Sequence, residues 1–295
     1  MIKSVEGYLE ALKAELKNSD AATIQDALGD AEEHLRAALA SLREEQPEMP
    51  EEELLARIVG QYGSPEETAS AYREVERRIT PQLAKENQRN ESALSRFFGV
   101  YADARAWGAL LYMLIAFATG VVYFTWAITG LSLSVSFVIF IFGFPFAILF
   151  LLSVRGLILI EGRLVEALLG IRMPRRPLFT ERNLKWIERL RQLVTDWRTW
   201  LSILYMIIQF VLGTVYFVLI VTVLSFSFAS IAVPFVQEIL DQAPIQMYGA
   251  RYYVPTWTYP LFVFGGFLLW TMFMNIARWI GQQHGRMAKA LLVTE

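Results

Sequence analysis

The sequence predicts an all-α membrane protein: a small cytoplasmic helical head followed by a four-transmembrane-helix bundle built from two parallel two-span repeats. The first observation behind this fold class is a split in charge. Residues 1–98 hold 20 acidic and 12 basic side chains, whereas residues 99–295 hold 9 acidic and 15 basic ones. The second part is therefore about 12% charged, compared with about 25% in a soluble domain. The other two observations are long uncharged runs and an internal repeat. Together they exclude a simple soluble globule.

The head, residues 1–85, reads as a unit of four helices. Apolar residues spaced three and four apart predict a first helix ending near Leu16 and a second from about residue 20 to 45. A third helix follows Pro50, where successive glutamates suit the helix dipole. Segment 63–67 supplies a helix stop, a cap and a capping-box glutamate, so it predicts the start of the fourth helix. Residues 86–105 would be a hinge and an amphipathic lead-in to the membrane.

The first membrane repeat is expected over residues 106–171. Ala106 to Val154 is a run of 49 residues without a charged side chain. Because about 20 helical residues cross the roughly 30 Å hydrocarbon core, this run predicts two spans, near 106–129 and 134–160. The break between them is expected at the Gly and Ser residues of segment 130–134.

The second membrane repeat is expected over residues 199–295. An uncharged run from Thr199 to Gln237 predicts a span near 200–224, and a second span is predicted near 259–281. Between them lies an outer loop, about 226–258, that is rich in aromatic residues.

The orientation follows from the basic residues of segment 172–198, which separates the repeats. This loop contains Arg172, Arg175, Arg176, Arg182, Lys185, Arg189, Arg191 and Arg198. By the positive-inside rule the loop is cytoplasmic, and with four spans both termini are cytoplasmic too. Its amphipathic stretch from Leu184 to Trp197 would lie on the inner leaflet or pack beneath the bundle, and both interpretations stay open.

The two repeats are visible as matching sequence copies. Segments 103–107, 111–113 and 120–124 recur 93 residues later, with Trp-x-x-x-Leu-Tyr-Met and Gly-x-x-Tyr-Phe elements in both copies. Glu161-Gly-Arg-Leu then matches His284-Gly-Arg-Met at an offset of 123, and Arg155 matches Arg278. Both copies enter the membrane from the same side, so the duplication is parallel.

No catalytic machinery is visible in the sequence. There is no cysteine, no metal-ligand spacing, no serine nucleophile elbow, no phosphate-binding loop and no pair of carboxylates within the spans. We therefore expect no enzyme activity, catalytic residue, cofactor or metal. The two histidines are interpreted as an exposed helix residue, His34, and an interfacial residue just after the last span, His284. Interhelical hydrogen bonds account for Gln209 and Asn275.

Several residues are candidates for contact with lipid or ligand. Arg155 and Arg278 lie near the ends of spans, where anchoring or lipid-phosphate contact is the first interpretation and a ligand site the second. Tyr123 and Tyr216, with Tyr112 and Tyr205, would line an apolar ligand pocket or mark close helix packing. Of the outer loop's aromatic residues, Tyr252, Tyr253 and Trp257 would form an external sensing surface or an interfacial lid.

Two family resemblances add to this picture. Tyr8-Leu9-x-x-Leu12, Ala31-Glu-Glu-His-Leu35 and segment 62–69 resemble the HAAS-type helical signalling domain over about residues 2–78. That resemblance implies a cytoplasmic, partner-binding module, often encoded beside PadR-type regulators of bacteria. The partner-binding candidates are Tyr8, Glu32, Glu33, His34, Tyr62, Gly63, Ser64, Pro65, Glu66 and Glu67. Residues 96–292 resemble the four-span sensor domain found at the front of some bacterial histidine kinases. The Trp and Gly-x-x-Tyr-Phe repeats of this chain carry the resemblance.

The expected function is therefore non-enzymatic signalling in a bacterial cytoplasmic membrane. The body would respond to a membrane or envelope signal, with membrane lipids as partners, and the head would capture or release a cytoplasmic regulator such as a PadR-type protein. Direct nucleic-acid binding is not expected, and the sequence leaves a homo-oligomer open. The alternatives are an accessory subunit of a transporter for an apolar or lipid-like substrate, and a structural membrane protein whose head mediates assembly.

Overall fold

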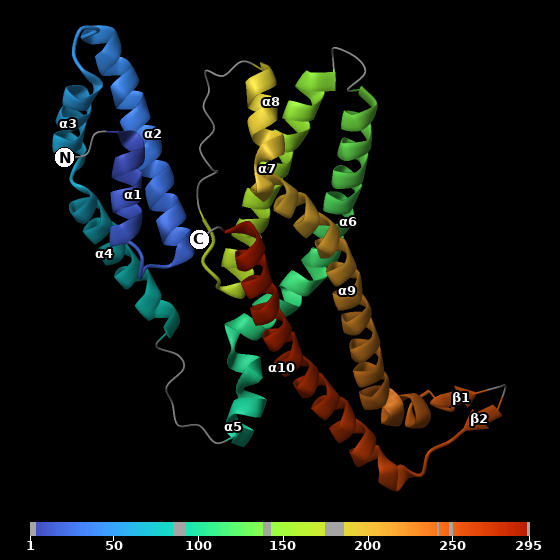
Figure 1. Ribbon diagram of the computed structural model, residues 1–295. Coiled ribbons are helices and arrows are strands. Elements are labelled where there is room, and N and C mark those ends of the chain that lie inside the picture. Colours follow the sequence, from blue (N-terminus) through green and yellow to red (C-terminus); the bar gives the residue numbers. More distant parts are fainter. Residues whose placement is uncertain are drawn as a thin grey trace.

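The fold comes from a computed structural model that describes residues 4–84, 93–137, 143–174, 186–240, 242–247 and 250–293. It is almost entirely helical (Figure 1), which confirms the predicted helical class. The two described strands, β1 (Ile245–Met247) and β2 (Ala250–Tyr252), form an antiparallel hairpin in which Gln246 is opposite Arg251.

The head contains α1 (Val5–Glu15), α2 (Ala21–Glu45), α3 (Glu51–Tyr62) and α4 (Pro65–Ala84). Its core includes Val5, Leu12, Leu16, Ala27 and Leu35, whose helical spacing predicts these helices, and further buried side chains such as Tyr8, Leu55 and Ile58. Asp20 caps α2 by accepting a hydrogen bond from the Ala22 amide at 3.2 Å. Burial of these few apolar faces is what holds four short helices together.

A capping box connects α3 to α4. Gly63 ends α3 with φ of 111°, a conformation that favours glycine. The Ser64 amide donates to Glu67 Oε2 at 2.9 Å, and the Glu67 amide donates to Ser64 Oγ at 3.2 Å. Both amides at this helix start are therefore satisfied, as the sequence predicted.

Replacing Ser64 with alanine is expected to destabilise the start of α4 by about 1 kcal/mol, because one of these amides loses its acceptor. Faster amide hydrogen exchange at the first turn of α4 in the full-length protein would show this. Ser70→Ala is the matched control, since the Ser70 hydroxyl only donates to the Glu67 carbonyl oxygen on the surface. Equal exchange rates in the two variants would contradict the capping role of Ser64.

The membrane body consists of a short lead-in and a set of long helices. The lead-in is α5 (Ala93–Phe98) and the 3-10 helix η2 (Gly99–Ala102). The remaining helices are α6 (Ala104–Phe137), α7 (Gly143–Leu169), α8 (Trp186–Thr195), α9 (Trp197–Glu238), η3 (Thr256–Thr258) and α10 (Tyr259–Leu292).

Two predicted boundaries of the body were wrong. Helix α6 continues through the predicted break at 130–134, and Gly130 packs against the Phe150 ring instead of forming a turn. Helix α9 continues to Glu238, well past residue 224, so the outer loop is shorter than predicted. The reason is the same in both places. In an apolar environment the backbone has no water to bond, and it stays helical through Gly and Ser residues that would end a helix in water.

Three helices are long and apolar enough to cross a membrane, judged over the described part of the chain. They are α6, α9 and the segment Thr256–Leu292, which fits a multi-pass membrane protein. The predicted span 134–160 includes residues 138–142, which lie outside the described ranges. Helix α7 begins after that gap, and the four-span arrangement remains a prediction.

Helices α6 and α9 cross in the body (Figure 1), and their backbones approach each other closely at Gly120 and Gly213. A Cβ atom added to Gly213 would lie 2.3 Å from the Ala116 carbonyl oxygen, and one added to Gly120 would lie 2.8 Å from the Gln209 carbonyl oxygen. Stacked rings flank the crossing on both sides, at centroid distances of 4.6 and 4.7 Å: Phe117 with Phe217 and Phe124 with Phe210. The glycines thus allow the two backbones to touch.

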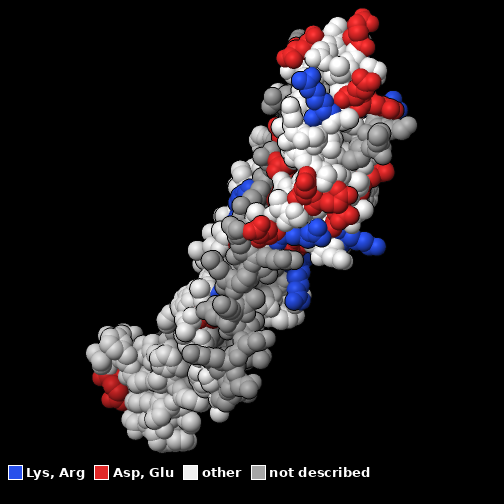
Figure 2. Space-filling model, turned by 90° about the vertical axis from the view of Figure 1, so that its left-hand side faces the viewer, with Lys and Arg blue, Asp and Glu red and all other residues white. Residues whose placement is uncertain are grey.

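The head docks on the end of α10, and the C-terminus lies beside it (Figure 1). Lys289 of α10 forms an ion pair with Asp20, the residue that caps α2. Ala22 belongs to the same apolar cluster as Ala288 and Val293. In Figure 2 charged side chains, mostly acidic, gather over the head, while the far end of the body is nearly free of them.

Candidate functional site: a buried polar cluster

Seven polar side chains meet where the long helices of the body pack together, and we call them the buried polar cluster. Relative exposure is 0% for Glu161 and Gln209 and 2% for His284. Its members are Tyr112 and Tyr123 of α6, Glu161 of α7, Tyr205, Gln209 and Tyr216 of α9, and His284 of α10. The cluster therefore ties together four helices from both sequence copies.

Glu161 is the main hydrogen-bond acceptor of the cluster. Its Oε1 accepts from the Tyr112 hydroxyl at 2.6 Å, from the Tyr205 hydroxyl at 3.0 Å and from Gln209 Nε2 at 3.3 Å. Its Oε2 accepts from the Tyr123 hydroxyl at 3.1 Å. Four donors directed at two oxygens suit an ionised carboxylate, which accepts only and forms stronger bonds when charged.

His284 completes the network from the opposite side. Its Nε2 lies 2.7 Å from the Tyr112 oxygen and 3.1 Å from the Tyr205 oxygen, and its Nδ1 lies 3.0 Å from the Tyr216 oxygen. Because the Tyr112 and Tyr205 hydroxyls donate to Glu161, Nε2 carries the hydrogen that their oxygens accept. Nδ1 can then accept from Tyr216 in a neutral ring or donate to it in an imidazolium. The cluster thus forms a cage around His284 that provides hydrogen-bond partners for both ring nitrogens in either charge state.

The sequence copies explain how the cage is assembled. Tyr112 and Tyr205 hold matching positions, as do Tyr123 and Tyr216. In each copy the two tyrosines are 11 residues apart, about three turns of one helix face. Glu161 and His284 also match in sequence. The matching positions therefore hold a carboxylate in one copy and an imidazole in the other.

The structure brings three of the sequence candidates into the cluster. His284, which the sequence places just after the last predicted span, is buried. Tyr123 and Tyr216 bond to Glu161 and His284, so their hydroxyls face polar groups. Glu161 was missed as a site residue because it lies outside the uncharged runs. Its match with His284 in the repeat was the signal that could have revealed it.

Arg155 and Arg278 form ion pairs that connect the two sequence copies. Arg278 Nη1 lies 3.0 Å from Asp103 Oδ2, and Arg155 Nη2 lies 2.6 Å from Asp196 Oδ2. Asp103 and Asp196 also cap the starts of α6 and α9, accepting from amides at 2.9 and 3.1 Å. This geometry accords with the anchoring interpretation of both arginines.

The candidate residues of the outer loop lie apart from the cluster. Tyr252, Tyr253 and Trp257 are 53, 55 and 73% exposed. Next to them, the Gln237 side-chain amide forms two hydrogen bonds of 2.9 Å with the backbone of Val254. Gln237 Nε2 donates to the Val254 carbonyl oxygen, and Gln237 Oε1 accepts from the Val254 amide. The segment that carries these aromatic residues is thus hydrogen-bonded to α9, and the three aromatic side chains are exposed.

The candidate residues of the head divide into core and surface. Tyr8 is buried, its hydroxyl donates to the Gly63 carbonyl oxygen at 2.9 Å, and burial raises its pKa. His34 is exposed and stacks on the Tyr62 ring at 4.6 Å. Glu32 pairs with Arg36, and Pro65 is buried. The exposed acidic candidates are Glu33, Glu66 and Glu67.

Metal binding finds no support in the part of the chain that the structure describes, where no group of three or more acidic or histidine residues could hold an ion. The cluster offers one carboxylate and one imidazole, and its other members are hydroxyls and an amide that bond to them.

Comparison with known proteins identifies the membrane body. The family model called Sensor, described as "Putative sensor", matches residues 112–292, more than half of the chain. The match starts at Tyr112 and includes every member of the buried polar cluster. No curated protein and no solved structure matches the chain. The chain therefore belongs to the Sensor family.

Proposed function

We propose that this protein is a membrane sensor that couples a signal in the membrane or cell envelope to a partner of its head in the bacterial cytoplasm. The observation that carries the proposal is the course of α10. This helix holds His284 in the buried polar cluster and, little more than one turn later, holds the head through Lys289. One helix therefore connects the most polar point of the body to the head.

The buried polar cluster would be the element with two states. Sensing requires two arrangements of the body that bind the signal with different affinity. In this proposal the cage holds His284 in either charge state, and the two arrangements differ in the direction of the Tyr216 hydrogen bond. The buried polar bonds would be strong in this apolar setting, so a shift of α10 would break or reform them together.

The output would be the docking of the head on α10. The Lys289–Asp20 ion pair and the packing of Ala22 against the α10 end would hold the head in one state. The hinge that the sequence predicted at 86–105 is a second route. Its residues 86–92 lie outside the described ranges. In this proposal the head exposes its acidic surface to a partner when α10 moves.

Lys289→Gln is expected to release the head, because Asp20 then loses its charged partner while it keeps its cap on α2. Amide hydrogen exchange of the first turn of α2 should rise severalfold in the full-length protein. Arg163→Gln is the matched control, since it removes one charge from an ion pair that lies within α7. Unchanged exchange at α2 in Lys289→Gln would contradict head docking through this pair.

The coupling itself is tested by capture of partners in cells. We expect crosslinking to recover a cytoplasmic regulator with the full-length protein, to lose it when residues 1–90 are deleted, and to change its yield in Lys289→Gln. Recovery of membrane proteins alone, unaffected by the deletion, would rule out the proposed coupling.

One observation favours the alternative of transport. Ionisable groups buried within a membrane protein often mark a substrate or proton path, and Glu161 and His284 are such groups. Flux of a lipid-like substrate or of protons in proteoliposomes that depends on Glu161 would support transport. Absence of such flux would leave sensing as the proposed function.

A further inference from the structure

The β1–β2 hairpin lies at the end of α10 that is opposite the head. Figure 1 shows it projecting to one side from the place where α9 ends and α10 begins. We call residues 242–247 and 250–258, which connect these two helices, the hairpin segment. Helix α9 and the segment Thr256–Leu292 are both long and apolar enough to cross a membrane. A short segment that joins the ends of two such helices lies at the level of a membrane surface.

The hairpin separates apolar from polar side chains. Successive residues of a strand point to opposite faces, whereas residues that are paired across two strands share a face. Ile245 is paired with Tyr252, and Gln246 is paired with Arg251. The hairpin therefore has an apolar face with Ile245 and Tyr252 and a polar face with Gln246 and Arg251. Ile245 and Tyr252 are 41 and 53% exposed, so the part of the chain that the structure describes leaves the apolar face open.

The hairpin segment is attached to both helices. Besides the two Gln237 bonds to Val254, the Tyr259 hydroxyl of α10 donates to Glu238 Oε1 of α9 at 2.6 Å. At the base of β1, Ala243 is buried. Because these contacts hold the segment in place, its exposed aromatic side chains can make an interface with little further loss of conformational entropy.

The helix turns next to the hairpin segment are apolar on the outside. Phe235 and Ile239 at the end of α9 are 54 and 67% exposed, and Leu261 and Phe264 at the start of α10 are both 63% exposed. Such side chains face lipid in a helix that crosses a membrane. Trp257, 73% exposed, lies between the hairpin and α10. Tryptophan and tyrosine of membrane proteins gather where the acyl chains meet the headgroups.

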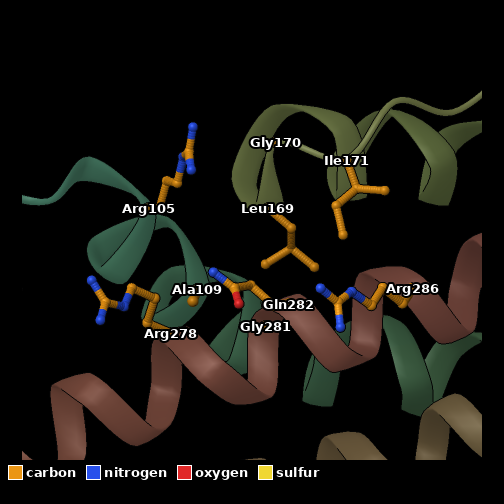
Figure 3. Close-up of a pocket in the computed structure, with 9 residues that line it drawn as sticks. All are labelled: Arg105, Ala109, Leu169, Gly170, Ile171, Arg278, Gly281, Gln282 and Arg286. Atoms are coloured by element: carbon orange, nitrogen blue, oxygen red, sulfur yellow. The ribbon is translucent and has the colours of Figure 1, made fainter. Parts of the chain in front are cut away.

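Charge distinguishes the two ends of α10. Figure 3 shows Arg105, Arg278 and Arg286 around a pocket toward the head end of this helix, with their guanidinium groups pointing in different directions. In the hairpin segment Arg251 is the only charged residue. Attraction to anionic headgroups takes a cluster of basic residues. Contact of the hairpin segment with lipid therefore depends on its apolar and aromatic side chains.

We propose that the hairpin segment docks on the lipid leaflet opposite the head. Ile245, Tyr252 and Trp257 enter the boundary between acyl chains and headgroups, and the polar face with Gln246 and Arg251 stays in water. The partner is the bilayer surface itself and not a soluble ligand or protein. The inference goes beyond the proposed function, since it holds for a sensor and for a transporter.

The test uses the absence of cysteine from the chain, which allows one spin label at a time without other changes. The labelled variants of the full-length protein, in phospholipid nanodiscs, are Ile245→Cys and Tyr252→Cys on the apolar face and Gln246→Cys and Arg251→Cys on the polar face. Electron paramagnetic resonance measures collision of each label with oxygen, which concentrates in lipid, and with a water-soluble nickel complex. We expect the ratio of oxygen to nickel accessibility to be severalfold higher at Ile245 and Tyr252.

The polar positions are matched controls, because each is the neighbour of an apolar position in the same strand. Preference for the nickel complex at all four positions would place the hairpin segment in water and overturn the proposal. Low accessibility to both reagents at Ile245 and Tyr252 would show that protein covers the apolar face, a second copy for example, and would overturn it too. If labels in the strands prevent folding, Trp257→Cys decides by the same ratio: preference for oxygen supports the proposal and preference for nickel overturns it.

Discussion

Replacing Glu161 with alanine is expected to lower the free energy of unfolding by about 3–5 kcal/mol, the usual cost of removing one member of a buried charged network. The variant takes the Glu161 acceptor from three buried tyrosine hydroxyls and leaves Gln209 Nε2 with only the Tyr112 oxygen. Chemical unfolding of the purified protein in detergent measures the loss. This is the largest effect that we expect from a single polar side chain.

Glu166→Ala is the matched control for Glu161→Ala. Glu166 lies in the same helix and pairs with Arg163 at 3.0 Å, but that pair is partly exposed. Its loss should cost less than about 1 kcal/mol. If both variants lose the same stability, the cluster does not hold the body together.

The pairing of Glu161 with His284 makes the same experiment more specific. Removing both side chains should cost less than the two single changes added, because each single change leaves a group without its partner. Additive losses would mean that the two residues act independently, and the proposed two-state cage would then be wrong.

Replacing Gly213 with alanine is expected to be among the most damaging single methyl additions in the described body. The new Cβ would lie 2.3 Å from the Ala116 carbonyl oxygen and 2.7 Å from the carbonyl carbon. Both atoms belong to backbone, so α6 and α9 must separate. We expect a loss of about 1–3 kcal/mol and weaker phenylalanine stacking beside the crossing, measured by chemical unfolding in detergent.

Two other glycines of the body serve as control sites for the replacement of glycine by alanine. Gly156 in α7 and Gly265 in α10 have nothing within 4 Å of an added Cβ. Alanine at either should be neutral or slightly stabilising, since alanine favours helix more than glycine does. A loss of stability in Gly265→Ala as large as in Gly213→Ala would show that helix crossing is not the cause.

Sequence alone predicted much of the helical fold for a physical reason. Helix starts depend on neighbouring residues, and Asp20 and the segment 63–67 of the head satisfy their own amides locally. The end of α6 could not be predicted in this way. Gly130 and the serines after it would break a helix in water, but packing against Phe150 and the lack of water keep the helix intact.

The candidate site was harder to predict because it depends on which helix faces meet. Tyr123 and Tyr216 were identified from their repeat, yet their partners lie on other helices and carry no local signal. Glu161 is followed by Arg163 and Glu166, so it reads as part of a polar helix end. Only the packing of α7 against α6 and α9 turns it inward.

The unequal chemistry of the matching positions has a consequence for the charge that the site can hold. A dimer of identical two-helix units would place two carboxylates, or two imidazoles, among four tyrosines. Like charges at that distance cannot both be ionised without a large cost. One carboxylate facing one imidazole avoids that cost, so the cage requires different residues at these two matching positions.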